Sequence, residues 1–380
     1  MKKILIIYEQ IDTTVNVNIA GLRDVLKGED VRYSLSKQVT SNDLQWCDIC
    51  LAIRPNSIYT LAIAKSVIDS GRFFVSLFDD DLLNLPEGHS FQWRSKYAKS
   101  ILELSQYVIC CNPSLISTFK DVSSRPKYVL SNAHILEEDI LPIQPVGTSV
   151  KVVYAAGKDH ADLFNSYILP AIDSLYNLFE GKVEFWLIGV VPDISKIEYK
   201  ECIKMIDTMP LEEYNQFMRE NRFDIGVAPL HDNQFCNKKY FNKYIEYTKC
   251  GIDGLYSNCL PYTLVVKNKF NGVLVNNTKE DWYNALVYAI KNMEETKAMA
   301  KRAQEHIEKD FTLTAAKSNY YKELDCLSAE KKDYKEVVYK KSSYKSFVFE
   351  INVAWHRFLS HYKSEGLYKT IVDALTLLFR

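Results

Sequence analysis

The sequence predicts an α/β protein with two Rossmann-like, doubly wound domains and a C-terminal helical tail. The chain has 380 residues, too many for one ordinary hydrophobic core. Short apolar runs alternate with helical periods in two successive series, a pattern typical of parallel sheets covered by helices on both faces. The connector EEDILPIQPVGTS, at 137–149, carries two prolines and a glycine. We therefore place the domains at 1–145 and 150–328, and the tail at 329–380.

The first series occupies the first 130 residues. Its expected strands are KILIIY at 3–8, VRYSL at 31–35, CDICLAI at 47–53, RFFVSLF at 72–78 and YVICC at 107–111. Helical periods lie between them at 16–27, 57–70 and 91–106. Because no GxGxxG motif follows the first strand, a dinucleotide-binding domain is disfavoured.

The second series repeats the same alternation. Its expected strands are 150–157, 182–189, 223–230, 251–257 and 271–277. Its expected helices are 161–180, 211–220, 239–250 and several between 280 and 327. Two doubly wound domains in series predict a cleft between them, lined by the carboxyl ends of strands, where such folds bind ligands.

Composition excludes several functional classes. With 47 Lys and Arg against 48 Asp and Glu, the net charge is -1, so we expect no nucleic-acid partner. The first apolar run is too short for a signal peptide, and no run approaches the roughly 18 apolar residues of a membrane-spanning helix. Nine cysteines, including the CxxC pair Cys47 and Cys50, form no disulfide framework or paired metal motif. We expect a cytoplasmic protein.

The tail has a different charge from the rest of the chain. Between Lys331 and Arg380, ten basic residues stand against five acidic ones, a net charge of +5, whereas the remainder sums to -6. Tyrosines interleave the lysines, and 351–362 and 367–380 both fit amphipathic helices. Two interpretations stay open: a surface that contacts anionic lipid at the inner face of the plasma membrane, or helices packed on the first domain with their lysines in water.

A charged stripe marks the expected helix at 239–250. Lys239, Lys243 and Glu246 share one face of it. Three residues on another face, which can pack on the sheet, are Phe241, Ile245 and Thr248. One interpretation is a solvated face with weak ion pairs. The other is an anion site, because the helix directly follows a strand and a polar loop: the lysines and helix end suit a diphosphate, and the glutamate suits ribose hydroxyls.

The stretch around this stripe resembles a known family. The matching pattern is FDIGVAPL, followed by F...K...K..EY and then by LYSN..PY and NGVLVNN. It resembles the donor-binding half of retaining GT-B glycosyltransferases, family 4 in the carbohydrate-enzyme classification. The resemblance extends from about 151 to 311. In the branch that acts on bacterial surface polysaccharides, a Phe, two Lys and a Glu occur at the offsets of Phe235, Lys239, Lys243 and Glu246.

The resemblance implies roles for individual residues. Lys243 would contact the donor diphosphate and Glu246 the ribose, as the catalytic and donor-binding pair. Pro261 and Tyr262 would shape the turn beside them. The segment GKDHADL resembles the family's first loop in this domain, which implies Lys158 and His160 as phosphate neighbours.

Two details of the donor region stay open. Asp162, in the same segment, is expected to cap a helix. Much of the family has a second glutamate eight residues before the ribose-binding one, where this sequence has Lys238. That lysine either suits an acidic donor sugar or points to solvent.

The first domain resembles the family more weakly. VSLFDDDLLNLP, with Asp79, Asp80 and Asp81, resembles a strand end of this branch, and YVLSNAHI resembles the asparagine turn that closes the acceptor domain. We assign these carboxylates, together with His89, to the acceptor side. A DxD triplet can bind a divalent cation. Because lysines and a helix end already serve the diphosphate, we expect no metal ion and no cofactor.

The resemblance implies a function. The protein would move a sugar from a nucleotide-diphosphate donor to a growing glycan or polyprenyl-linked acceptor, with retention, in lipopolysaccharide or capsule synthesis. One alternative is a non-catalytic relative that binds nucleotide sugars or serves as a scaffold, which Lys238 favours. Another is an epimerase or phosphorylase of the same architecture.

Overall fold

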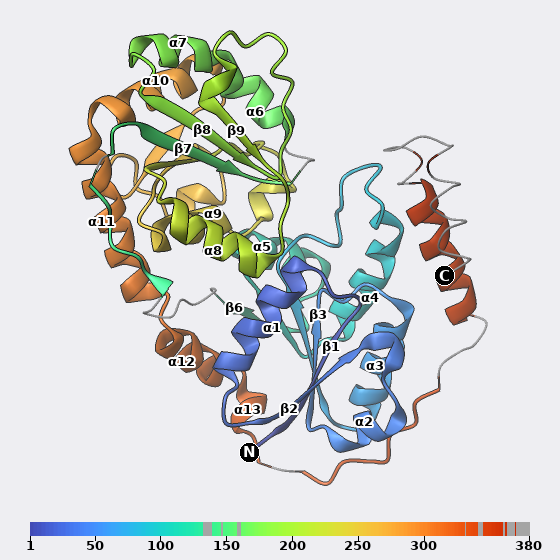
Figure 1. The fold of residues 1–380 in the computed structure, drawn as a ribbon. Helices are drawn as coiled ribbons and strands as arrows, with labels where there is room; N and C mark the ends of the chain where they lie inside the picture. Colours follow the sequence, from blue (N-terminus) through green and yellow to red (C-terminus); the bar gives the residue numbers. More distant parts are fainter. Residues whose placement is uncertain are drawn as a thin grey trace. The chain divides into compact units, whose positions relative to one another are not determined.

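Two compact units make up the protein. The computed structural model describes residues 1–131, 139–145, 147–157, 161–330, 332–340, 345–359, 362 and 369 (Figure 1). The units are Met1–Ser131 with Tyr320–Arg380, and Asn132–Asn319. Each contains one six-stranded parallel sheet with flanking helices, so the predicted pair of doubly wound α/β domains is confirmed. Residues 320–328, which we assigned to the second domain, group with the first unit.

The sheet of the first unit has the order β2-β1-β3-β4-β5-β6. Its strands are β1 (Lys3–Tyr8), β2 (Asp30–Leu35), β3 (Ile49–Ile53), β4 (Phe73–Phe78), β5 (Tyr107–Cys110) and β6 (Lys127–Leu130). All pairings are parallel. The strand order reverses between β1 and β3, and doubly wound sheets bind ligands at the carboxyl ends of such a pair.

Side chains cap several of the helices of this unit at their first turn. The helices are α1 (Thr13–Val25), η1 (Ser36–Gln38), α2 (Ser41–Trp46), α3 (Ile58–Asp69), η2 (Gln92–Arg94), α4 (Ser95–Leu104), α5 (Pro113–Val122) and α13 (Asp325–Ser328). Helix α1 starts three residues before the predicted 16–27 because Asp12 Oδ1 accepts a hydrogen bond from Val15 N at 2.8 Å. The predicted helix at 91–106 is divided into η2 and α4.

The sheet of the second unit has the order β12-β11-β10-β7-β8-β9. Its strands are β7 (Val150–Ala155), β8 (Val183–Ile188), β9 (Ile203–Ile206), β10 (Ile225–Ala228), β11 (Asp253–Ser257) and β12 (Val273–Val275). Strand β9 was absent from the prediction, because at the sheet edge only one of its side chains is fully buried and no long apolar run marks it. Here the strand order reverses between β7 and β10.

One predicted helix of this unit is interrupted by a proline. The helices are α6 (Ala161–Tyr167), η5 (Leu169–Ala171), α7 (Ile172–Leu178), η6 (Lys200–Cys202), α8 (Leu211–Asn221), η7 (Cys236–Lys238), α9 (Asn242–Lys249), η8 (Tyr262–Leu264), α10 (Lys279–Lys291) and α11 (Met293–Asp310). Pro170 divides the predicted helix at 161–180, because proline lacks the N–H that a continuous helix needs. Helix α12 (Leu313–Glu323) contains the boundary between the units.

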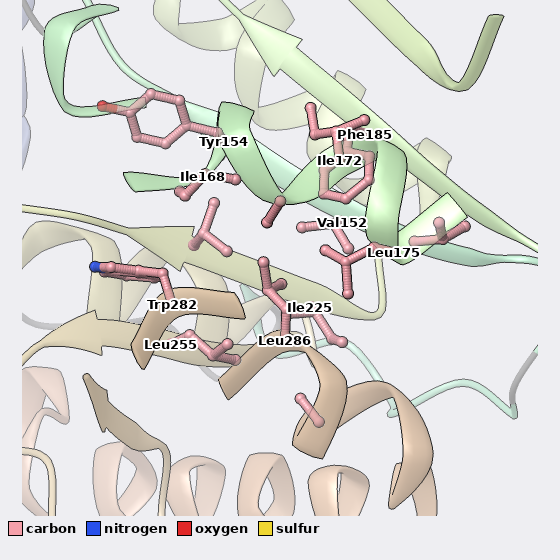
Figure 2. Packing of buried hydrophobic residues seen from close by; sticks show 14 of the residues in the cluster. Val152, Tyr154, Ile168, Ile172, Leu175, Phe185, Ile225, Leu255, Trp282 and Leu286 are labelled. Carbon is pink, nitrogen blue, oxygen red and sulfur yellow. The ribbon is translucent and has the colours of Figure 1, made fainter. Parts of the chain in front are cut away.

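Buried hydrophobic side chains cover both faces of the second sheet, and one of these layers lies between the sheet and helices that include α7 and α10. Figure 2 shows Val152, Phe185 and Ile225 of the sheet meeting Ile172 and Leu286 of the helices. All five side chains are at most 1% exposed. This buried layer holds the central strands, and therefore their carboxyl ends, in place.

The described part of the tail packs against the first unit. Val337, Phe349 and Val353 are buried. Arg72 donates hydrogen bonds to the carbonyls of Cys47, Gln45 and Lys335 at 2.9, 3.1 and 2.9 Å. These contacts favour the second interpretation of the tail for residues 332–359, while most of 360–380 lies outside the described residues.

Two further findings concern the membrane and the cysteines. None of the helices that the structure describes combines the length and apolar character needed to cross a bilayer. Cys47 and Cys50 are buried free thiols. Burial raises the pKa of Cys47 to about 12, so this thiol stays protonated near neutral pH.

Arg72→Met should loosen the tail. The substitution removes three charge-assisted hydrogen bonds made by a side chain that is 2% exposed, so the free energy of unfolding should fall by about 2–3 kcal/mol. Thermal unfolding measures the loss of stability, and limited proteolysis at 332–340 measures the loosening of the tail. Arg23→Met, at a side chain that is 70% exposed, is the matched control and should change neither. Unaltered protease resistance in Arg72→Met would contradict the anchoring role.

Candidate functional site

The carboxyl ends of β7 and β10 mark the expected ligand site of the second unit. Among the described residues, a side-chain contact joins the segments that follow these strands: His231 Nε2, after β10, lies 2.9 Å from Asp162 Oδ2 in the first turn of α6. Helix α6 begins at Ala161, so Asp162 lies within the helix and the expectation that it caps the helix is wrong. Lys158 and His160, the expected phosphate neighbours, lie outside the described residues.

Helix α9 follows the loop after β10, and a glycine of β10 determines how closely it approaches the sheet. A Cβ atom on Gly226 would lie 2.4 Å from Tyr247 Cδ2, so only a glycine leaves room for this ring. The Tyr247 hydroxyl donates to the Val227 carbonyl at 2.9 Å. On the neighbouring strand β11, Gly254 leaves room for the ring of Tyr256, which lies two residues further along the same strand. Helix α9 is therefore seated directly on β10.

The apolar face predicted for this helix is confirmed. Phe241, Ile245 and Thr248 are 4%, 8% and 1% exposed. The helix itself is shorter than predicted, because Lys239 has an extended backbone after η7 and α9 starts only at Asn242. Lys239 consequently does not share a helix face with Lys243 and Glu246, which corrects the predicted stripe.

The remaining pair forms the centre of the candidate site. Lys243 lies in the first turn of α9, and its Nζ donates to Glu246 Oε2 at 2.5 Å. Tyr214 of α8 donates its hydroxyl to the same oxygen at 3.1 Å, and Lys243 Nζ lies 5.6 Å from the centre of the Tyr214 ring. Both contacts use Oε2, so Oε1 keeps its capacity to accept hydrogen bonds from a ligand.

The titration behaviour of these groups favours a charged pair. Burial raises the pKa of Glu246, but the attraction of Lys243 and the hydrogen bonds from Lys243 and Tyr214 outweigh it, and the pKa lies below its usual value. Burial, reinforced by Glu246, holds the pKa of Tyr214 well above its usual value. Near neutral pH the site therefore contains a carboxylate fixed by a cation and by a neutral phenol.

The loop between β10 and α9 holds three further residues of the predicted pattern. Asn233 Oδ1 accepts hydrogen bonds from the amides of Phe235 and Cys236 at 3.1 and 2.9 Å, which organises η7. Lys239 Nζ lies 5.4 Å from the centre of the Phe235 ring. Lys238 is partly buried, so its side chain is not directed fully into solvent.

The carboxyl ends of β10, β11 and β12 are joined by a polar clamp. Ser257 Oγ accepts a hydrogen bond from Leu230 N at 2.8 Å and donates to Asn277 Oδ1 at 2.7 Å. Asn277 Nδ2 donates to the Leu230 carbonyl at 2.8 Å. Beside this clamp, Pro261 is buried, and the Tyr262 ring lies 4.9 Å from that of Tyr256. The two residues thus lie where η8 begins, after β11.

The sequence did not single out four of these residues. They are Tyr214, His231, Ser257 and Asn277. The first lies on a predicted helix that carried no other sign of function, and the others act through contacts between segments distant in the chain. An alternating or helical pattern carries no information on such contacts.

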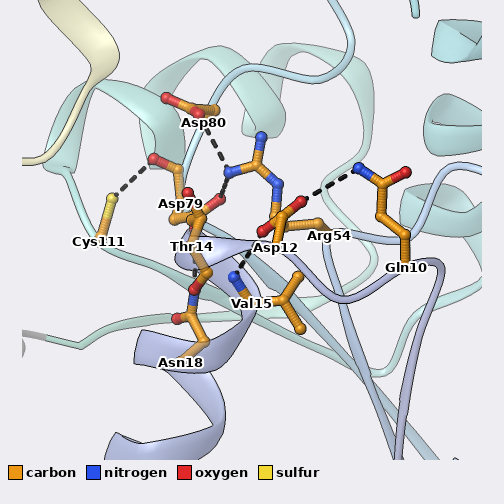
Figure 3. A network of polar contacts seen from close by, with 9 residues as sticks. All are labelled: Gln10, Asp12, Thr14, Val15, Asn18, Arg54, Asp79, Asp80 and Cys111. Carbon is orange, nitrogen blue, oxygen red and sulfur yellow. Dashed lines mark hydrogen bonds and ion pairs between the residues drawn. The ribbon is translucent and has the colours of Figure 1, made fainter. Parts of the chain in front are cut away.

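In the first unit the three predicted carboxylates separate into two groups. Figure 3 shows Arg54 directed between Asp79 and Asp80, with Nη1 to oxygen distances of 2.5 and 3.1 Å. Asn18 donates to Asp79 Oδ2 at 2.8 Å. Burial raises the pKa of Asp79 despite the attraction of Arg54. Asp81 is turned elsewhere, accepting hydrogen bonds from Asn84.

These contacts bear on the metal alternative. The guanidinium of Arg54 occupies the position between Asp79 and Asp80 where a shared cation would bind. In the described ranges no cluster of three or more His, Cys, Asp or Glu side chains is placed to hold a metal ion. His89 Nδ1 accepts a hydrogen bond from Phe91 N at 3.1 Å and so takes part in the local turn.

Comparison with known proteins places this arrangement in context. No protein-family profile and no curated protein matches the sequence. HepE from Anabaena, solved in complex with UDP, superimposes with a TM-score of 0.65 at 13% identity, over 86% of this chain and 100% of HepE. Sucrose-phosphate synthase from Thermosynechococcus elongatus gives 0.65 at 11% identity, over 86% and 99%. The chain has the GT-B fold.

The GT-B fold is shared by proteins of more than one activity. A putative UDP-N-acetylglucosamine 2-epimerase from Listeria monocytogenes superimposes with a TM-score of 0.56 at 9% identity, over 88% of this chain and 99% of that one. At such identities the likeness establishes the fold, and the activity must be argued from the residues of the site.

Gly226→Ala tests the seat of α9. The added methyl group collides with the Tyr247 ring, so the free energy of unfolding should fall by about 1–3 kcal/mol. Gly147→Ala, where a Cβ meets only Ser149 O at 3.5 Å, is the control and should be nearly neutral. Thermal unfolding compares the two, and equal melting temperatures would contradict the close contact.

The pH dependence of stability reports on Glu246. Because its pKa in the folded protein lies below the ordinary value of 4.5, its stabilising effect is fully present above that pH and is lost as the pH falls through the lowered folded value. The difference in melting temperature between the wild type and Glu246→Gln should therefore stay constant from pH 7 to 5 and narrow below 4.5. A difference that never changes with pH would mean that the charge contributes nothing.

Proposed function

We propose that this protein is a glycosyltransferase that uses a nucleotide-diphosphate sugar as donor. The observation that carries the proposal is the Lys243–Glu246 pair, held by Tyr214 at the start of the helix that follows β10. It lies beside the strand-order reversal where doubly wound sheets bind nucleotides. The complexes of HepE with UDP and with UDP-glucose support a uridine donor as the first candidate.

In the proposed donor complex, the two charged groups have different tasks. Lys243 gives one of its three N–H donors to Glu246 and directs the others to the diphosphate. Glu246 accepts the ribose hydroxyls with Oε1, while its other oxygen stays fixed by Tyr214 and Lys243. Lys239 and Phe235, together with Lys158 and His160 outside the described residues, remain predicted donor neighbours.

Charge development determines which residues act in the reaction. As the bond between the anomeric carbon and the diphosphate breaks, negative charge grows on the leaving group. Lys243, already oriented by its ion pair, stabilises that charge, which lowers the barrier more than it strengthens donor binding. Neither a metal ion nor a cofactor is required in this proposal, since the leaving group is served by a lysine.

The finer parts of the proposal follow from the family resemblance. They are membership of family 4, retention at the anomeric carbon, and transfer to a glycan or polyprenyl-linked acceptor in surface-polysaccharide synthesis. We assign acceptor contacts to the first unit, around Asp79, Asp80, Asp81 and His89, and membrane contact to 331–380. The solved structures that resemble this chain support sugar transfer. The identity of the acceptor is part of the proposal and requires a test of its own.

Nucleotide binding is the decisive measurement. Thermal unfolding with UDP, GDP, dTDP or CMP, each with and without Mg²⁺, should show one nucleotide that raises the melting temperature without metal. At about a hundred times its dissociation constant, the ligand adds roughly 2.7 kcal/mol, which corresponds to several degrees. Glu246→Gln should abolish the shift, and Glu213→Gln on α8 should retain it. Loss of the shift in both variants, or in neither, would contradict the site.

Tyr214→Phe separates positioning from binding. The variant keeps the ring beside Lys243 and loses only the hydroxyl that orients Glu246, so nucleotide affinity should fall about tenfold. Isothermal titration measures the change, and unaltered affinity would remove Tyr214 from the site.

Turnover distinguishes the alternatives. Release of nucleoside diphosphate that depends on an added acceptor supports transfer. Conversion of the nucleotide sugar without an acceptor would assign an epimerase, and binding without any turnover would assign the non-catalytic relative.

A further inference from the structure

The tail helix at 345–359 carries apolar side chains on two opposite faces. Its inner face includes Phe349 and Val353, which are 4% and 8% exposed. On the other side, Phe347, Ile351 and Trp355 recur at intervals of four residues and are 64%, 52% and 56% exposed. We call these three residues the outer stripe. A helix that is apolar on both faces is normally covered on both, so the outer stripe is expected to have a partner.

The outer stripe belongs to an unusual concentration of exposed apolar groups. Sixteen large hydrophobic side chains among the described residues are exposed, and six of them lie between 338 and 362. Those six are Val338, Phe347, Val348, Ile351, Trp355 and Tyr362. The others are distributed over the remaining described chain, and isolated exposed hydrophobics are ordinary on protein surfaces. A cluster of this kind instead marks an interaction surface.

Specific contacts hold the helix in one orientation on the first unit. His356 stacks on Trp93 with ring centres 5.4 Å apart and an interplanar angle of 11°. The Tyr59 hydroxyl donates to Glu350 Oε1 at 3.0 Å, and the Phe349 ring packs edge-on against Tyr59 at 5.7 Å. The outer stripe is therefore presented by a docked helix, with its direction determined by the inner face.

The charge of the tail identifies the chemistry of the partner. From Lys331 to Arg380 the net charge is +5. Lys345 and Arg357 are exposed near the two ends of the same helix, four residues from Phe349 and Val353 respectively, so they border the inner face. An apolar and aromatic stripe on a helix of a basic tail, with a long basic side chain near each helix end, suits a surface whose interior is hydrocarbon and whose boundary is anionic. A soluble protein partner is less suited, since protein interfaces are depleted of lysine.

We propose that the outer stripe docks on an anionic lipid bilayer. Phe347, Ile351 and Trp355 enter the boundary between headgroups and acyl chains, and the basic side chains of the tail contact the headgroup phosphates. Trp355, with Phe358 stacked on it at 5.9 Å, supplies the aromatic group that prefers this boundary. Residues 345–359 thus lie on the membrane without crossing it.

The position of the helix connects this surface to the chemistry. Glu350 contacts Tyr59 in the first turn of α3, the helix that follows β3. The stripe-bearing helix therefore lies beside the carboxyl edge of the first sheet, where the strand order reverses between β1 and β3. This inference rests on the proposed function in one respect: a bilayer at this edge would deliver an acceptor whose carrier is a lipid.

Vesicle sedimentation tests the proposal with the full chain. Wild-type protein should sediment with vesicles of phosphatidylglycerol and phosphatidylcholine, and at least fivefold less with phosphatidylcholine alone. Phe347→Ser/Ile351→Ser should lose most of this binding and keep the wild-type melting temperature, because both side chains are exposed. Leu178→Ser/Met205→Ser, at 43% and 46% exposed positions of the second unit, is the matched control and should bind as the wild type does.

Fluorescence locates the contact on the helix. Lipids brominated near the headgroup should quench the emission of Trp355, measured as the difference between the wild type and Trp355→Phe. Absence of that difference would overturn the assignment of the contact to the outer stripe.

Three other outcomes would also overturn it. Sedimentation of Phe347→Ser/Ile351→Ser at the wild-type level would exclude the stripe. A dimer in lipid-free solution that this variant disrupts would assign the stripe to a second copy of the chain. A large loss of stability in the variant would show that another part of the chain covers the stripe. The nucleotide-induced thermal shift is independent of all three, so failure here is distinguishable from failure of the proposed function.

Discussion

The position of the candidate site depends on the contact between a tyrosine ring and a bare strand backbone. Tyr247 of α9 lies so close to Gly226 of β10 that any side chain there would overlap the ring. The phenol also donates to the carbonyl of the next residue, Val227. Distance and direction are thus determined together. Because Lys243 and Glu246 lie on the same short helix, their positions follow from this one contact.

The rest of the site completes what that contact begins. Below the helix, paired glycines at 226 and 254 make room for a layer of tyrosine rings. At the carboxyl edge, Ser257 and Asn277 bind the main chain of Leu230 and hold the start of the loop that leads to α9. On helix α8, Tyr214 donates its hydroxyl to Glu246 Oε2 and not to Oε1, so Oε1 can accept hydrogen bonds from a ligand. A rigid apolar seat and a polar edge together preorganise the charged pair.

Prediction from sequence succeeded where local spacing decides the geometry. Lys243 and Glu246 are three residues apart, and in any helix that spacing makes them neighbours. It failed for Lys239, because Asn233 organises a 3₁₀ turn and delays the start of the helix. It also missed Tyr214, whose partner is 32 residues away. In the first unit, the aspartate triplet at 79–81 was recognisable from the sequence. Its ion pairs with Arg54 and its hydrogen bonds with Asn84 were not.

The sequence by itself determined the alternation of strands and helices, the two-unit α/β architecture, the buried face of α9 and the charged pair on it. Each of these follows from periodicity, which is a property of neighbouring residues. Only the tertiary structure decided the strand orders, the edge strand β9, the grouping of 320–380 with the first unit and the contacts of Asp79 and Asp80. These features depend on contacts between segments that are distant in the chain, and the packing of the whole core determines which of those contacts form.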